Sequence, residues 1–107
     1  MQIPTPDATP TPHFTGRAVI DEHGEPLGSV DDVIFDQNDE TPEYLIVKPG
    51  LLRRAHYVPV DGAYESIEGD IVVPWDRQWF KQSPVASREH VLTPIERVDV
   101  DSHYAHH

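Results

Sequence analysis

The sequence predicts an all-β fold, and three observations favour this class. The chain has 107 residues, of which 37% are hydrophobic, with 11 prolines and 6 glycines. That composition is poor for a helical bundle and ordinary for a small β domain with many turns. Short apolar runs alternate with turn clusters between Phe14 and Val73, as in a small barrel or meander. Finally, residues 16–36 read GRAVIDEHGEPLGSVDDVIFD, in which a D-x-x-G-x-x-x-G spacing separates two apolar runs and indicates a β-hairpin.

The turn of this hairpin is expected to depend on three residues. Asp21 supplies local hydrogen bonds, while Gly24 and Gly28 supply the positive φ angles that a reversing backbone needs. The flanking strands are Ala18 to Ile20 and Val30 to Phe35.

The predicted strands follow five apolar runs: Arg17 to Ile20, Leu27 to Phe35, Tyr44 to Val47, His56 to Val60 and Asp70 to Val73. The second run changes parity, because Val30 and Ile34 lie on one face and Leu27, Val33 and Phe35 on the other. Either a bulge shifts the register, which we favour, or both faces are covered. The third and fifth runs are continuously apolar, so a partner subunit or the C-terminal segment is expected to cover their outer faces.

The chain divides into three parts. Residues 1–12 alternate proline with threonine and aspartate and are predicted to be a flexible tail, residues 13–84 to be the β domain, and residues 85–107 to be a partly helical or disordered extension. A short helix is expected after Asp76 as N-cap, with Pro84 as a stop just beyond it. A capping box, Thr93-Pro94-Ile95-Glu96, predicts a second helix that either frays or docks.

Composition excludes several kinds of function. With no cysteine, disulfides, thiolate metal sites and cysteine nucleophiles are impossible, and a cytoplasmic location is expected. We expect no membrane insertion, because no window approaches the roughly 18 apolar residues of a membrane span, and the N-terminus lacks the features of a signal peptide. The formal net charge of −11 repels phosphate backbones, which disfavours direct nucleic-acid binding but not contact with a basic protein surface.

The sequence resembles the PRC-barrel domain family. The resemblance rests on Gly16, the Asp21-to-Gly28 turn, Val30-x-Asp32-Val33-x-x-Asp36, the Tyr44 to Val47 strand and Val58-Pro59-Val60. Val73-Pro74-Trp75, followed by a short helix and Pro84, is similar to the stand-alone bacterial type. Relatives include the cytoplasmic domain of the photosynthetic reaction centre H subunit and the C-terminal domain of a ribosome maturation factor. The resemblance implies a small β-barrel of about six strands with a short C-terminal helix, acting as a non-catalytic docking module.

The only concentrated basic group lies on the turn between the third and fourth strands, and it is the best candidate for a partner contact. Surface charge that merely solubilises a hairpin tip is the alternative. Four aromatic residues either form an exposed patch or, as we favour, pack in the core; they are Tyr57, Trp75, Trp79 and Phe80. The predicted partner-binding residues are Lys48, Leu51, Leu52, Arg53, Arg54, His56 and Trp79.

No metal, cofactor or catalytic site is predicted. His103, His106 and His107 could present imidazoles to one side of a helix, but no further ligand stands at a fixed spacing, so metal binding is only an alternative. The segment from Asp36 begins like a calcium loop without its glycine and its final glutamate. Asp31 and Asp32 are adjacent, and on a regular strand they point to opposite faces, which argues against joint acid–base chemistry.

We therefore expect a non-catalytic protein-interaction or adaptor module that forms a homodimer. Two alternatives stay open at this point. One is an accessory factor of RNA metabolism that binds a ribosomal protein, and the other is metal binding through the C-terminal histidines.

Overall fold

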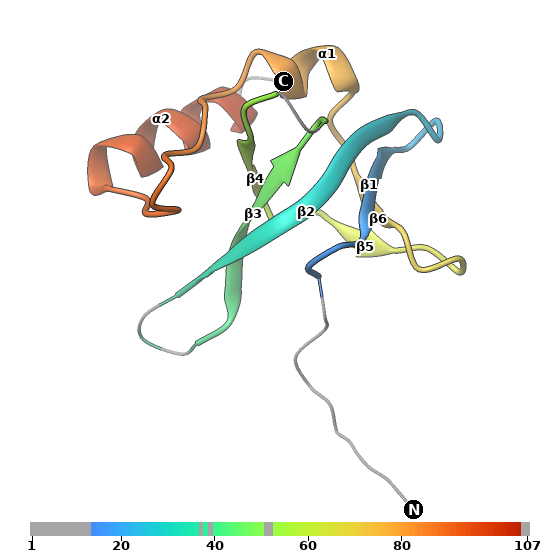
Figure 1. Ribbon diagram of the computed structural model, residues 1–107, viewed down its shortest axis with the longest axis horizontal. Helices are drawn as coiled ribbons and strands as arrows, with labels where there is room; N and C mark the ends of the chain where they lie inside the picture. Colours follow the sequence, from blue (N-terminus) through green and yellow to red (C-terminus); the bar gives the residue numbers. More distant parts are fainter. Residues whose placement is uncertain (1–13, 37, 39, 51–52, 106–107) are drawn as a thin grey trace, which may run out of the picture.

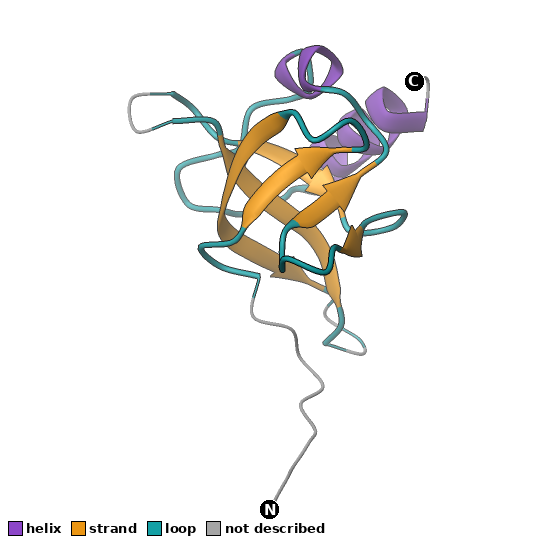
Figure 2. Cartoon of the chain, turned by 90° about the vertical axis from the view of Figure 1, so that its right-hand side faces the viewer, coloured by secondary structure: helices purple, strands orange, loops and turns teal. Residues whose placement is uncertain are grey.

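The computed structural model describes residues 14–36, 38, 40–50 and 53–105. Its six strands form one sheet in the order β4-β3-β2-β1-β6-β5, with every neighbouring pair antiparallel except β1 and β6, which are parallel. The sheet curls into a partly rolled cylinder with both helices towards one end (Figures 1 and 2), and β4 and β5 remain as its edges. This architecture confirms the predicted small barrel-like β fold with a short C-terminal helix. The strands are β1 (Ala18–Asp21), β2 (Pro26–Phe35), β3 (Pro42–Lys48), β4 (His56–Pro59), β5 (Tyr64–Glu65) and β6 (Ile71–Val73).

The first hairpin, β1 to β2, forms as the spacing predicts. The carboxylate of Asp21 accepts hydrogen bonds from the backbone N–H groups of His23 and Glu25, at 2.8 and 2.9 Å, and Gly24 has a φ of 84°. Gly28 differs from the prediction, since it is not among the glycines with positive φ. A side chain at Gly28 would instead overlap the carbonyl group of Lys48. Glycine is needed here because β2 and the end of β3 approach closely.

The long strand β2 contains the predicted bulge. Val30 pairs with Val47 and Asp32 with Ile46, so Asp31 is the extra residue, and a second irregularity follows Ile34. A bulge bends its strand and turns successive side chains to the same side of the sheet. The parity change in the sequence therefore marks a real break in register.

The chain itself covers the two continuously apolar strands. Tyr44 to Val47 of β3 and all of β6 are buried. Helix α2 (Pro94–Ala105) packs against β4 and contributes Val100 and Tyr104 to the core. Asp101 of α2 also accepts a hydrogen bond from the Tyr44 hydroxyl of β3 at 2.5 Å. Of the two covers that the sequence left open, the C-terminal segment therefore reaches one of the two apolar strands, β3.

Both helices begin at the predicted caps. The Asp76 carboxylate accepts a hydrogen bond from the Trp79 N–H at 2.8 Å, and α1 (Arg77–Lys81) ends just before Pro84. At α2 the Thr93 hydroxyl accepts from the Glu96 N–H at 3.2 Å, and the Glu96 carboxylate accepts from the Thr93 N–H at 3.0 Å. These reciprocal bonds confirm the capping box, and the helix docks rather than frays.

The edge strand β4 is shielded by the segment that follows α1. His56 and Val85 form an isolated antiparallel bridge, and the Ala86 N–H donates to the Ala55 carbonyl at 2.8 Å. An edge strand with its backbone groups occupied is a poor template for unwanted strand pairing. Among the described residues, neither helix is long and apolar enough to cross a membrane.

Candidate functional site

Five of the eight lysine and arginine residues line three adjoining hollows around the loop between β3 and β4. They come from the end of β3, the loop itself, the last turn of α1 and the loop before α2. Within the described part of the chain, none of the five forms an ion pair with a carboxylate. We call this group the basic surface; it consists of Lys48, Arg53, Arg54, Lys81 and Arg88.

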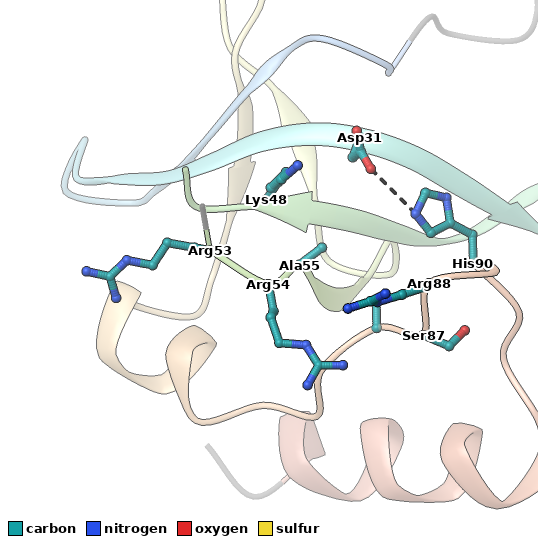
Figure 3. Close-up of a pocket in the computed structure, with 9 residues that line it drawn as sticks. Asp31, Lys48, Arg53, Arg54, Ala55, Ser87, Arg88 and His90 are labelled. Atoms are coloured by element: carbon teal, nitrogen blue, oxygen red, sulfur yellow. Dashed lines mark ion pairs between the residues drawn. The ribbon is translucent and has the colours of Figure 1, made fainter. Parts of the chain in front are cut away.

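Four of these five cations line one open pocket of about 350 Å³, here called the arginine pocket. Figure 3 shows Arg53 and Arg54 leaving the chain in different directions, with Arg88 facing them from the loop before α2. The guanidinium groups therefore line a stretch of surface rather than converge on one point. The same two loop arginines also line a neighbouring hollow with Lys81, so the positive charge continues beyond the pocket.

Arg88 stands on a loop that Tyr57 pins to the barrel. The buried Tyr57 side chain reaches out from β4, donates its hydroxyl proton to the Val91 carbonyl at 2.9 Å and accepts from the Ser87 N–H at 3.2 Å. The Ser87 hydroxyl closes the loop by donating to the same Val91 carbonyl at 3.0 Å. A core side chain thus fixes the position of an exposed arginine.

The bulge in β2 forms the opposite wall of the arginine pocket. Asp31 and Asp32 both face His90. The His90 Nε2 lies 3.5 Å from an Asp31 oxygen (Figure 3), and its Nδ1 lies 2.8 Å from an Asp32 oxygen. The expectation that these two carboxylates point to opposite faces was wrong, because the bulge turns them to one side. The hydrogen bond from His90 lowers the pKa of Asp32 from its ordinary value. His90 itself has a φ of 57°, so the loop holds it in the left-handed region.

The structure separates the predicted partner-binding residues. Lys48, Arg53 and Arg54 line the arginine pocket, and Leu51 and Leu52 lie outside the described residues. His56 is buried, with its Nδ1 2.9 Å from the Ser83 carbonyl and its ring 5.0 Å from that of Phe80. Burial lowers the pKa of His56, so the neutral ring is favoured and its role in this structure is in packing.

Trp79 is half-buried between the two helices, where its ring stacks on His103. Tyr57, Phe80 and Trp75 are buried, which confirms the core interpretation of the aromatic residues. His103 holds the Trp79 carbonyl through Nε2, while His106 and His107 lie outside the described residues. In the described ranges, no group of three or more acidic, histidine or cysteine side chains is arranged to hold a metal ion.

Two serines share a site with a histidine: Ser83 with His56, and Ser87 with His90 in the arginine pocket. The Ser83 hydroxyl lies 3.1 Å from His56 Nδ1, but it is buried and donates to the Phe80 carbonyl at 2.6 Å. In the arginine pocket, the Ser87 hydroxyl bonds the Val91 backbone while His90 faces two carboxylates. A nucleophile needs a base aligned on its proton, and in both places the hydroxyl proton goes to a backbone carbonyl.

Sequence reasoning missed Arg88 and Lys81 as members of the basic surface. Both lie far along the chain from Arg53, and only the docking of the segment after β6 brings them near. A sequence signal existed for Lys81, since the predicted helix had to pack on the barrel. Arg88 had none, because its placement depends on the bonds from Tyr57.

A curled six-stranded sheet with two small helices defines a small β-barrel-like domain. The chain matches the family model of the PRC-barrel domain over residues 13–106. It therefore belongs to the PRC-barrel domain family, as the sequence predicted, and this membership indicates a small protein-interaction module. A search among curated proteins found no match to the chain.

Proposed function

We propose that this protein is a non-catalytic docking module that binds a partner protein through its basic surface. The observation that carries the proposal is the concentration of five cations, without an ion pair among the described residues, around adjoining hollows of a chain whose net charge is −11. Elsewhere in the described chain, Arg17 and Arg97 pair with Glu65 and Glu43. Clustered cations repel one another, so their grouping lowers stability unless a partner supplies the missing negative charge.

The construction of the surface also supports a binding role. Its members come from four segments, and core contacts hold two of these segments in place: the α1 turn through buried Phe80 and the Arg88 loop through Tyr57. A rigid scaffold that presents exposed side chains on loops is the common arrangement of binding sites. The proposal includes a cytoplasmic location, which the cysteine-free composition favours.

The test is an affinity capture from the native host with the full chain as bait. Arg54→Glu removes one cation from the basic surface, and Arg77→Glu makes the same charge change at an exposed position outside it. A partner that is retained by the wild type and by Arg77→Glu, is lost from Arg54→Glu, and rebinds after purification supports the proposal. Identical capture by all three baits would contradict it. If the partner is a ribosomal protein, the accessory role in RNA metabolism follows as the specific case.

A further inference from the structure

The arrangement of the cations points to the chemistry of the occupant. We infer that the basic surface binds a short, extended peptide segment of a partner that carries several separate carboxylates. This inference rests on the proposed docking function and names the class of ligand that the surface takes.

The first argument is the spread of the charges. Arg53 and Arg54 point in different directions and Arg88 stands across the pocket from them (Figure 3). Lys48 and Lys81 each line one of the two neighbouring hollows. A single compact dianion would need the guanidinium groups to converge on it. Separate cations along a surface suit a series of single negative charges along an extended segment, with each arginine able to pair with a carboxylate through two N–H groups.

The second argument concerns the negative charge that lies near these cations. Among the described residues that line the three hollows, the one carboxylate belongs to Asp31, and it is turned to His90 (Figure 3). It faces four cations that line the same pocket, so it offsets only part of their charge; they are Lys48, Arg53, Arg54 and Arg88. The interior of the surface is left positive, and carboxylates can approach the guanidinium groups there.

The third argument concerns nucleic acid, whose phosphates carry negative charge as the carboxylates of a peptide do. The rest of the domain is strongly acidic, since the chain carries 19 acidic residues against 8 lysines and arginines. A polynucleotide backbone that leaves the basic surface runs onto this acidic exterior and is repelled, whereas a short peptide ends within the surface. The geometry therefore favours a peptide segment over RNA or DNA.

The experiment measures binding of a fluorescent synthetic peptide of alternating glutamate and glycine to the full chain by polarisation. The matched control peptide has glutamine in place of glutamate. Wild type is expected to bind the glutamate peptide saturably, with an affinity that falls as salt is raised, and to ignore the glutamine peptide. Arg54→Glu and Arg88→Glu should each weaken binding by about tenfold, while Arg77→Glu should stay within about twofold of wild type. Far-ultraviolet circular dichroism and thermal unfolding check that each variant is folded.

Four results would overturn the inference. The first is that the glutamate peptide shows no saturable binding, and the second is that Arg77→Glu weakens its binding as much as Arg54→Glu does. The third is that an oligouridylate of the same formal charge binds more tightly than the glutamate peptide. The fourth is that a phosphoserine version of the peptide binds much more tightly than the glutamate peptide. If a captured partner still depends on Arg54 while the glutamate peptide fails, the carboxylate assignment is wrong and the docking function stands. If no partner depends on Arg54, the docking function itself is wrong.

Discussion

The indole ring of Trp79 stacks on the imidazole ring of His103, with the ring centroids 4.5 Å apart and the planes inclined by 16°. The contact is reciprocal, because the Trp79 Nε1–H donates to the His103 carbonyl at 3.1 Å and His103 Nε2 lies 2.8 Å from the Trp79 carbonyl. Together they join α1 to the last turn of α2. Two residues that the sequence suggested for binding, one for a partner and one for a metal, thus hold the two helices together.

Replacing Trp79 with alanine should release α2 from the barrel. The change removes a large half-buried ring and its Nε1–H hydrogen bond to the His103 carbonyl, while the Trp79 backbone carbonyl that faces His103 Nε2 is kept, so we expect a loss of about 2–4 kcal/mol in the free energy of unfolding. Urea denaturation measures the loss, and amide hydrogen exchange should accelerate most in α2. Gln78→Ala, an exposed neighbour on α1, is the control and should change little. Unchanged exchange in α2 would contradict this role of Trp79.

Tyr57→Phe should disturb the basic surface without touching any of its cations. It removes the hydroxyl that binds the Val91 carbonyl and the Ser87 N–H, so the loop that carries Arg88 loses two anchors. We expect a loss of about 1–3 kcal/mol in the free energy of unfolding and a partner affinity weaker by about three- to fivefold. Chemical denaturation and titration of the captured partner measure the two effects.

Tyr64→Phe is the matched control, because Tyr64 is 55% exposed on β5 and far in the sheet order from β4. It should leave both quantities near wild type. If Tyr57→Phe loosens the loop but the partner binds with unchanged affinity, Arg88 does not belong to the docking surface.

Much of this fold could be predicted because local signals and packing agree. The Asp21 turn, the Asp76 cap and the Thr93–Glu96 capping box each act over a few residues and are found where the sequence places them. Strand β5 was missed because its two residues, Tyr64 and Glu65, are both exposed and form no apolar run. It is a strand only because its backbone pairs with β6.

The candidate site was predictable only in part. The sequence shows Lys48, Arg53 and Arg54 as one basic group, and the structure keeps them together. His56 was grouped with them by proximity along the chain, but α1 and the residue Ser83 after it cover this part of β4, so the ring is buried against Phe80 and Ser83. The pairing of Asp31 and Asp32 at His90 needed the exact position of the bulge, which apolar parity alone does not give.

His56 should make the stability depend on pH in a defined direction. Its folded pKa lies below the ordinary value of 6.5, because burial disfavours the charged ring. Between the two pKa values only the unfolded chain binds the proton, so the contribution of His56 to stability is complete above 6.5 and is lost as the pH falls towards the folded pKa. His56→Asn keeps an amide N–H that can donate to the Ser83 carbonyl, but the asparagine side chain does not titrate in this pH range.

The measurement is the free energy of unfolding of wild type and His56→Asn from about pH 8 to about pH 5. The free energy of unfolding of wild type should exceed that of the variant by less as the pH falls. His23→Asn, at an exposed position in the first turn, should run parallel to wild type. A constant difference between wild type and His56→Asn across this range would show that the buried ring does not resist protonation.

The homodimer stays a prediction, although the apolar strands that suggested it are covered within the chain. The exposed apolar residues Ile95 and Val98 lie one turn apart on α2, with 77% and 66% of their surface exposed, and they give a dimer its most suitable contact. Light scattering of the purified protein at micromolar concentration should show a species larger than the 12.1 kDa chain. Ile95→Glu with Val98→Glu should shift it to the monomer, and a wild type that is wholly monomeric would rule the dimer out.

The most direct test of the docking account is amide hydrogen exchange of the full chain with and without its captured partner. The account predicts slower exchange at residues 53–55 and 86–88, which flank the arginine pocket, and little change along the outer face of α2. Protection confined to α2, or to the β1–β2 turn, with the arginine pocket unchanged, would contradict the claim that partners bind on the basic surface.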